Sequence, residues 1–163
     1  MIIETFVFPH FIYCMTVWAG CGKSQKQRLQ KVLNHCAQIV KGARRHTHVT
    51  PVLRELQWPS IEDLVAERDM GMVHWLLTNQ HAPVSLRERL VFRGNVSART
   101  TRATDAGQLE LPRVRTEHAR SYFLFRAISL WNNAPASVKE TNTAAVCRKR
   151  TRKWRRENGT NER

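Results

Sequence analysis

Aspartate is scarce in this sequence. Only three occur, Asp63, Asp69 and Asp105, and none is adjacent to another. Phosphoryl transfer with two metal ions needs several carboxylates around the ions, and this distribution does not supply them. No serine lies in a G-x-S-x-G turn, and no cysteine has an evident general base near it in the sequence. We therefore expect that the chain is not an enzyme.

Paired metal ligands are lacking as well. His46 and His48 are close together and Cys36 precedes them, but the sequence has no C-x-x-C pair and no H-x₃₋₅-H pair of the kind that forms a tetrahedral zinc site. The four cysteines are irregularly spaced, which favours free thiols, mostly buried, over a disulfide framework. We expect neither a metal nor another cofactor.

Long apolar runs are absent too. The apolar block in residues 6–20 is interrupted by Pro9 and His10 and is shorter than the ~20 apolar residues that span a bilayer. It also lacks the basic segment that opens a signal peptide. The Gly-Lys-Ser of residues 22–24 resembles the end of a phosphate-binding loop, but Val17 stands where that loop needs a glycine. We expect an intracellular protein, nuclear or cytoplasmic, with no membrane partner.

What the sequence has in excess is positive charge. Lysine and arginine number 27 against 13 acidic residues, which gives a net charge of +14 and a pI near 10.8. Such an excess attracts polyanions, and nucleic acid is the commonest polyanionic partner. Drift of an unselected chain is the alternative, because net charge reports on partners and solubility and not on fold.

The clearest helix is expected over residues 24–41. Ser24 and Gln27 fit a capping box at its start, and Gly42 fits a left-handed cap at its end. Helical spacing places apolar residues on one face: Leu29, Val32, Leu33, Cys36, Ile39 and Val40. The opposite face is polar or cationic: Arg28, Lys31, Asn34, His35, Gln38 and Lys41. One side is therefore expected to be buried, and the other to meet a partner.

Other segments complete a helical pattern. The apolar run of residues 11–18 fits a strand or a helix, and we favour a helix because no partner strand is visible. Thr50, as the N-cap before Pro51, is expected to start a short helix. Ser60 is expected to start a longer helix, and Glu117 is expected to start an amphipathic helix that ends at Asn132. The predicted fold class is mainly α, a small irregular helical bundle.

Two basic segments are expected to lack regular structure. Residues 92–116 contain glycine, proline and arginine and predict a long exposed loop, in which Leu109 is at best part of an edge strand. The arginine-rich residues 148–156 repel one another and predict a disordered C-terminal tail, which resembles a nuclear-import signal and includes Trp154 as the one tryptophan surrounded by charge. Four regions follow: residues 1–90, 91–116, 117–139 and 140–163.

Four blocks of the chain together resemble a family. Residues 9–20 resemble the "HPHFxYCxxVWG" segment that follows the polymerase core of non-LTR, LINE-type (jockey-like) retrotransposon reverse transcriptases. Residues 28–34 resemble the "RLQxxQN" helix of that family, residues 48–58 its "HVTPLLxxLxW" segment and residues 130–135 its "LWNSLP" segment. The blocks keep the family's order and cover roughly residues 5–140. After Pro135 the family usually ends in a more apolar helix, whereas this chain continues in arginine.

The resemblance implies the thumb and post-thumb region of such a reverse transcriptase, with residues 1–90 as the thumb-like part. The family's metal-binding aspartates and its endonuclease lie outside these blocks, so no catalytic residue is carried over. A thumb holds RNA or DNA by its backbone, and the upstream polymerase core would pack on residues 6–18. The expected phosphate contacts are basic residues in three segments: Arg28, Lys31, Lys41, Arg44, Arg45, Arg113 and Arg115.

Another class of function is the alternative. The chain would then be a helical protein-interaction module, or a non-functional transposon remnant, whose apolar N-terminus associates with other proteins or with a second copy of itself.

Overall fold

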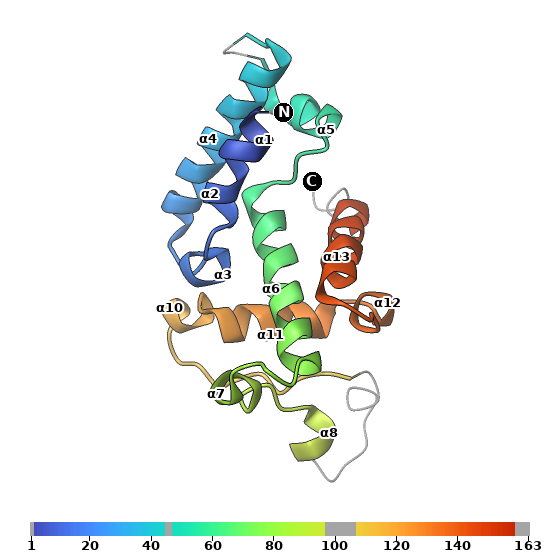
Figure 1. Ribbon diagram of the computed structural model, residues 1–163. Coiled ribbons are helices and arrows are strands. Elements are labelled where there is room, and N and C mark those ends of the chain that lie inside the picture. Colours follow the sequence, from blue (N-terminus) through green and yellow to red (C-terminus); the bar gives the residue numbers. More distant parts are fainter. Residues whose placement is uncertain (1, 45–46, 97–106, 159–163) are drawn as a thin grey trace. The chain divides into compact units, whose positions relative to one another are not determined.

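The structure, a computed structural model, describes residues 2–44, 47–96 and 107–158. These residues are mainly helical, as the sequence predicts (Figure 1). Contacts divide the chain into two units, Met1–Val65 and Ala66–Arg163, and the division falls inside one helix. The four regions predicted above were defined by amino-acid composition. The contacts do not test these boundaries, so the four regions stay a prediction.

The first unit consists of short helices packed on one long helix. They are α1 (Ile2–Phe6), α2 (Phe8–Ile12), α3 (Met15–Trp18), α4 (Lys23–Lys41) and α5 (Val49–Glu55), followed by the first turn of α6 (Ile61–Thr78). Figure 1 shows α1 and α2 alongside α4, with α5 near the end of α4. The helical prediction for residues 11–18 is thus confirmed, with a break at Cys14, whose φ is 46°.

The ends of α4 confirm one predicted cap and correct another. Gly42 has φ 61° and ψ 25°, and the amide of Ala43 donates to the carbonyl of Gln38 at 2.9 Å, as in a left-handed glycine cap. The capping box is wrong, because the N-cap is Gly22 and the Ser24 hydroxyl donates to Gln25 Oε1 instead.

A similar shift corrects the start of α5. This helix begins at Val49 and has His48 as its N-cap, so Thr50 lies within the first turn and is not the N-cap. In the next helix Ser60 does act at the start, since its hydroxyl accepts a hydrogen bond from the amide of Asp63 at 3.1 Å. Boundaries of short helices depend on tertiary contacts, which local residue preferences do not include.

The core of the first unit joins the short helices to α4 and α6. Its buried members come from α2 to α6 and the turns between them: Phe11, Met15, Ala19, Leu33, Ala37, Val52, Trp58, Ile61, Leu64 and Val65. The Trp58 ring lies edge-on to Phe8, with 4.9 Å between ring centroids, and its indole N–H donates to Glu4. Gln30 Oε1 accepts from the amide of Ile61 at 2.8 Å and so satisfies a free amide at the start of α6.

The second unit is built around the rest of α6 and α11 (Phe123–Asn133). It also contains α7 (Val84–Arg87), α8 (Arg93–Val96), α10 (Glu117–Arg120), α12 (Ala136–Lys139) and α13 (Ala144–Asn158). Buried residues of its core come from α6, α11, α12, α13 and the segments before α8 and α10: Met70, Val73, Leu76, Leu90, Leu109, Ile128, Trp131, Val138 and Cys147. The single helix predicted over residues 117–132 is in fact α10 and α11, separated at Ser121 and Tyr122.

The predicted loop of residues 92–116 needs a partial correction. Residues 97–106 lie outside the described part, but Phe92 and Leu109 form an antiparallel bridge on either side of them. Leu109 is fully buried, because its side chain fills the core of the second unit. The expectation of a long exposed loop is therefore wrong at Leu109, which is buried.

The predicted disorder of the tail is wrong for residues 144–158, which form α13. Repulsion between its arginines is offset by burial of Cys147 and Thr151 and by an ion pair between Arg152 and Glu67. Gly71 permits this packing, since a Cβ there would lie 2.6 Å from Cγ of Arg148. Residues 159–163 of the predicted tail lie outside the described part.

Candidate nucleic-acid interface

Two of the predicted phosphate contacts lie together on the exposed face of α4. Arg28 and Lys31 are exposed, and their i, i+3 spacing makes them neighbours on the helix surface. His35, one turn further along, is exposed as well. This cluster, Arg28, Lys31 and His35, is called the α4 cationic face below.

Apolar side chains flank the α4 cationic face. Val32 is 51% exposed and Ile39 is 59% exposed, so the prediction that both belong to the buried side is wrong. The buried stripe centres on Leu33 and Ala37, and Gln38 is buried where the prediction placed it on the polar side. The Gln38 amide nitrogen donates to the carbonyl of Thr47. The α4 cationic face is therefore narrower than the sequence predicted.

Lys41 differs from the other two cations of α4. Thirteen residues at about 100° each place it about 140° around the helix from Arg28. Its ammonium lies 2.9 Å from Glu55 Oε2, in a pair whose two side chains are both exposed. Lys41 as a phosphate contact stays a prediction, but it does not share a face with Arg28.

The remaining predicted contacts are spread along the chain. Arg44 is exposed just after the cap at Gly42, and Arg45 lies outside the described residues. Arg113 and Arg115 are exposed in the second unit, in the segment that leads to α10. The structure thus gathers Arg28 and Lys31 on one helical face and Arg113 and Arg115 on one short segment.

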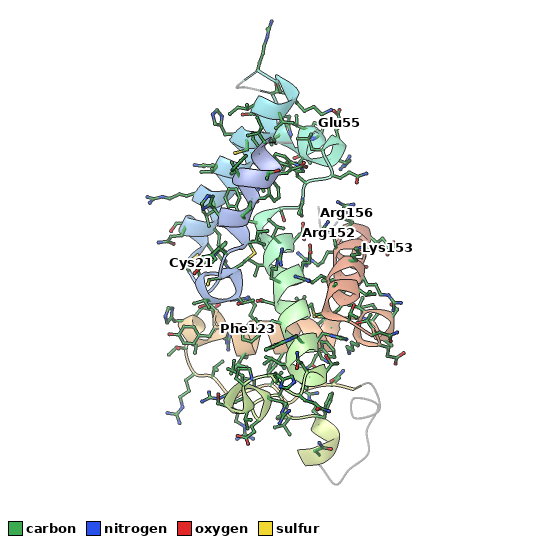
Figure 2. The ribbon with its side chains drawn as sticks, viewed as in Figure 1. Cys21, Glu55, Phe123, Arg152, Lys153 and Arg156 are labelled. Atoms are coloured by element: carbon green, nitrogen blue, oxygen red, sulfur yellow. The ribbon has the colours of Figure 1, made fainter. Side chains whose placement is uncertain are left out.

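A groove of about 460 Å³ opens beside the α4 cationic face, within the first unit. Its walls are largely apolar and include Phe11, Trp18, Leu29 and Val32, with Arg28 also lining it. Cys21, labelled in Figure 2 at the end of the α3 region, is part of the same lining. An apolar groove with one guanidinium can accept an apolar group that carries negative charge nearby.

Sequence reasoning missed the charged contacts of α6 with α13. Arg152 donates to both carboxylate oxygens of the buried Glu67, at 2.8 and 2.9 Å. Arg68 lies in the same group, and burial lowers its pKa, with the charge of Arg148 acting in the same direction. The Nε of Arg68 is buried, and none of the described residues accepts a hydrogen bond from it. The missed signal was the charged run Glu67-Arg68-Asp69 between apolar residues in the middle of α6.

Among residues 2–44, 47–96 and 107–158, no three histidine, cysteine or acidic side chains come together as they would around a metal ion. Within the same ranges, none of the helices has the length and apolar character needed to span a bilayer.

Comparisons of the chain with family models, with curated proteins and with solved structures find no match. The likeness to reverse transcriptases therefore stays a prediction from the quoted motifs.

Proposed function

We propose that this chain is a non-catalytic helical protein that binds the backbone of RNA or DNA irrespective of sequence, as the C-terminal region of a non-LTR reverse transcriptase. Such a function implies an intracellular site of action, in the nucleus or the cytoplasm. One observation carries most of the proposal, which is the exposure of Arg28 and Lys31 side by side on α4.

The charge balance around these residues supports phosphate binding. α4 contains five lysine and arginine residues and no acidic residue: Lys23, Lys26, Arg28, Lys31 and Lys41. Phosphates that meet exposed cations release condensed counterions, and this release favours binding without reading the bases. The flanking Val32 and Ile39 can contact sugar carbons, which carry no sequence information.

The test is the salt dependence of binding. Fluorescence anisotropy would measure the affinity of the whole chain for a labelled mixed-sequence DNA duplex and an RNA hairpin at several KCl concentrations. For the duplex, Arg28→Gln with Lys31→Gln should reduce the slope of log affinity against log salt by about 1.8, since each phosphate contact adds about 0.9. Sequence changes in the duplex should not alter the affinity.

The matched control removes two exposed cations elsewhere. Arg87 and Arg89, in and just after α7, are both exposed, so changing both to glutamine gives the same loss of charge. An equal loss of slope in both variants would show that only net charge matters. Absence of salt-dependent binding by the unmodified chain would overturn the proposal.

A protein-interaction function is the second candidate, because the first unit exposes large apolar side chains. Phe6 is 67% exposed, and Tyr13 and Val17 are each 77% exposed. Phe11 and Met15, which lie between them in sequence, are buried in the unit's own core. In the segment expected to pack on an upstream polymerase core, some apolar side chains are therefore buried within the first unit and others are exposed.

Point substitutions test this second candidate better than deletion. Removing residues 1–20 would also remove Phe11, Met15 and Ala19 from the core and would unfold the unit. Phe6→Ser with Tyr13→Ser leaves that core intact. If the apolar surface mediates self-association, size-exclusion chromatography should show oligomers for the unmodified chain and monomers for the variant, with unchanged nucleic-acid affinity.

A further inference from the structure

The helix α13 concentrates more positive charge than any other helix described in the structure. Its fifteen residues contain one acid, Glu157, and seven bases: Arg148, Lys149, Arg150, Arg152, Lys153, Arg155 and Arg156. Like charges one turn apart on a helix destabilise it by roughly 0.2–0.5 kcal/mol per pair. A helix with this composition needs tertiary contacts to persist.

Those contacts occupy one side of α13. Cys147 and Thr151 are buried, and Trp154 packs against the core of the second unit. These three residues follow the i, i+4, i+7 spacing of one helical face. Arg150 is held at the edge of that face, where its guanidinium donates to the carbonyls of Ser137 and Glu140.

The opposite side of α13 is exposed and cationic. Lys149, Lys153 and Arg156 are exposed and also follow i, i+4, i+7 spacing, which places them within about 60° of one another. Figure 2 shows Lys153 on the side of α13 away from α6 and Arg152 on the side toward it. Lys153 lies 3.9 Å from Glu157, and both are exposed, so water largely screens this pair. Lys149, Lys153 and Arg156 are called the α13 ridge below.

The charged residues on the packed side of α13 do not neutralise the positive charge of the α13 ridge. Three guanidiniums, Arg68, Arg148 and Arg152, act on one another there, and Glu67 is the carboxylate that pairs with Arg152. Burial and the charges of Arg148 and Arg152 lower the pKa of Arg68, although Glu67 acts in the opposite direction. The field of α13 therefore stays positive on its exposed side, which favours a polyanion.

We propose that the α13 ridge binds the sugar-phosphate backbone of a nucleic-acid duplex. This inference rests on the proposed function and gives it a second contact helix, in the second unit. From Lys149 to Arg156 the helix rises by seven steps of about 1.5 Å, so the ridge is about 10.5 Å long. One DNA strand carries a phosphate every 3.4 Å along the duplex axis, so the ridge matches about three phosphates.

The same geometry disfavours single strands as the target. Binding to unpaired bases relies on aromatic side chains that stack on them. Trp154, the aromatic residue of α13, packs against the core instead, and the exposed residues of the helix are lysine, arginine, glutamate, asparagine, alanine and valine. A surface with this composition recognises the spacing of phosphates in a duplex and not the bases.

The experiment compares two triple variants of the whole chain. Lys149→Gln, Lys153→Gln and Arg156→Gln together remove the ridge. The control, Arg87→Gln, Arg89→Gln and Arg120→Gln, removes three exposed cations of the same unit. Circular dichroism and thermal unfolding would verify that both variants fold. Anisotropy titrations would use a mixed-sequence DNA duplex, the corresponding single strand, and poly-glutamate as competitor.

The ridge variant should lower the salt slope for the duplex by about 2.7, at about 0.9 per phosphate. A fourfold rise in salt would then weaken the unmodified chain about 40-fold more than the ridge variant. The control variant should retain the original slope. A ridge variant that also retains it, while Arg28→Gln with Lys31→Gln lowers it, would overturn this inference and leave the proposed function standing.

Other outcomes are equally distinct. No salt-dependent binding by the unmodified chain would remove the proposed function and this inference together. Equal affinity and slope for the single strand would contradict the duplex as target. Displacement by poly-glutamate at the same charge concentration as duplex would show that the ridge binds an acidic protein, and this outcome also overturns the inference.

Discussion

The side-chain amide of Asn132 pairs with the backbone of Leu109 through two hydrogen bonds. The Leu109 amide donates to Asn132 Oδ1 at 2.8 Å, and Asn132 Nδ2 donates to the Leu109 carbonyl at 2.9 Å. α11 thus satisfies both polar groups of a residue whose side chain is fully buried. This pairing fixes the segment that leads to Arg113 and Arg115.

Asn132→Ala should destabilise the second unit by about 1–3 kcal/mol, because it leaves the buried polar groups of Leu109 without partners. Urea unfolding would measure the change. Asn133→Ala is the matched control: Asn133 is adjacent and exposed, so its loss should change stability by less than about 0.5 kcal/mol. Equal effects of the two substitutions would contradict a specific role for Asn132.

A buried ion pair also stabilises the second unit. Arg126 donates to both carboxylate oxygens of Asp69, at 2.6 and 3.1 Å, and to the carbonyl of Ser121. Asp69→Ala should destabilise the fold by about 3–5 kcal/mol, because it leaves the Arg126 charge without its carboxylate in a largely buried site. Denaturant unfolding with circular dichroism is the measurement.

Two further variants separate the pair from its surroundings. Asp69→Leu with Arg126→Met replaces both charges by apolar groups and should recover much of the stability lost in Asp69→Ala. Glu117→Ala breaks the exposed pair with Arg120 and should cost less than about 1 kcal/mol. A double variant no more stable than Asp69→Ala would rule out the unpaired charge as the cause.

The orientation of α4 predicts that two of its aliphatic residues contribute differently to stability. Leu33 is fully buried, whereas Ile39 is 59% exposed. Leu33→Ala should cost about 2–5 kcal/mol through lost contacts and a cavity. Ile39→Ala removes a similar number of carbon atoms and should cost less than about 1 kcal/mol. Thermal unfolding would compare the two, and equal costs would contradict this orientation.

Local signals account for what the sequence predicted well. The apolar spacing in residues 29–40 and the glycine at position 42 gave α4 and its C-terminal cap, because both depend on neighbours within a few residues. The assignment of Val32 and Ile39 to the buried side was wrong for a different reason. The helices packed on α4 cover only part of its apolar stripe, and periodicity does not report how wide that cover is.

Non-local pairs account for what was missed. The arginines of residues 148–156 were expected to repel one another and to leave the tail disordered. Their partner Glu67 was not recognised, because it lies 85 residues from Arg152 in the sequence. In the same way, Asn132 contacts Leu109 across 23 residues. The candidate site shows the same limit: composition identified cationic segments, but only the fold shows that Lys41 lies 2.9 Å from Glu55.

The thiol of Cys147 is expected to resist alkylation. Burial raises its pKa, although the neighbouring hydroxyls of Thr151 and Thr141 and the charges of Arg148 and Arg150 act in the opposite direction. Thiolate is the reactive form, so a buried thiol with a raised pKa reacts slowly. With iodoacetamide at pH 8, mass spectrometry should find the exposed Cys14 modified first and Cys147 last.

The same pKa shift predicts a dependence of stability on pH. The folded state holds the Cys147 proton more tightly than the unfolded state does, so its contribution is complete below the ordinary thiol pKa of about 8.5 and is lost as the pH rises above it. Between pH 8 and 10 the unmodified chain should therefore lose more unfolding free energy than Cys147→Ala. Cys14→Ala, at an exposed thiol, should follow the unmodified chain. Identical losses in the unmodified chain and in Cys147→Ala would show that the buried thiol does not cause the decline.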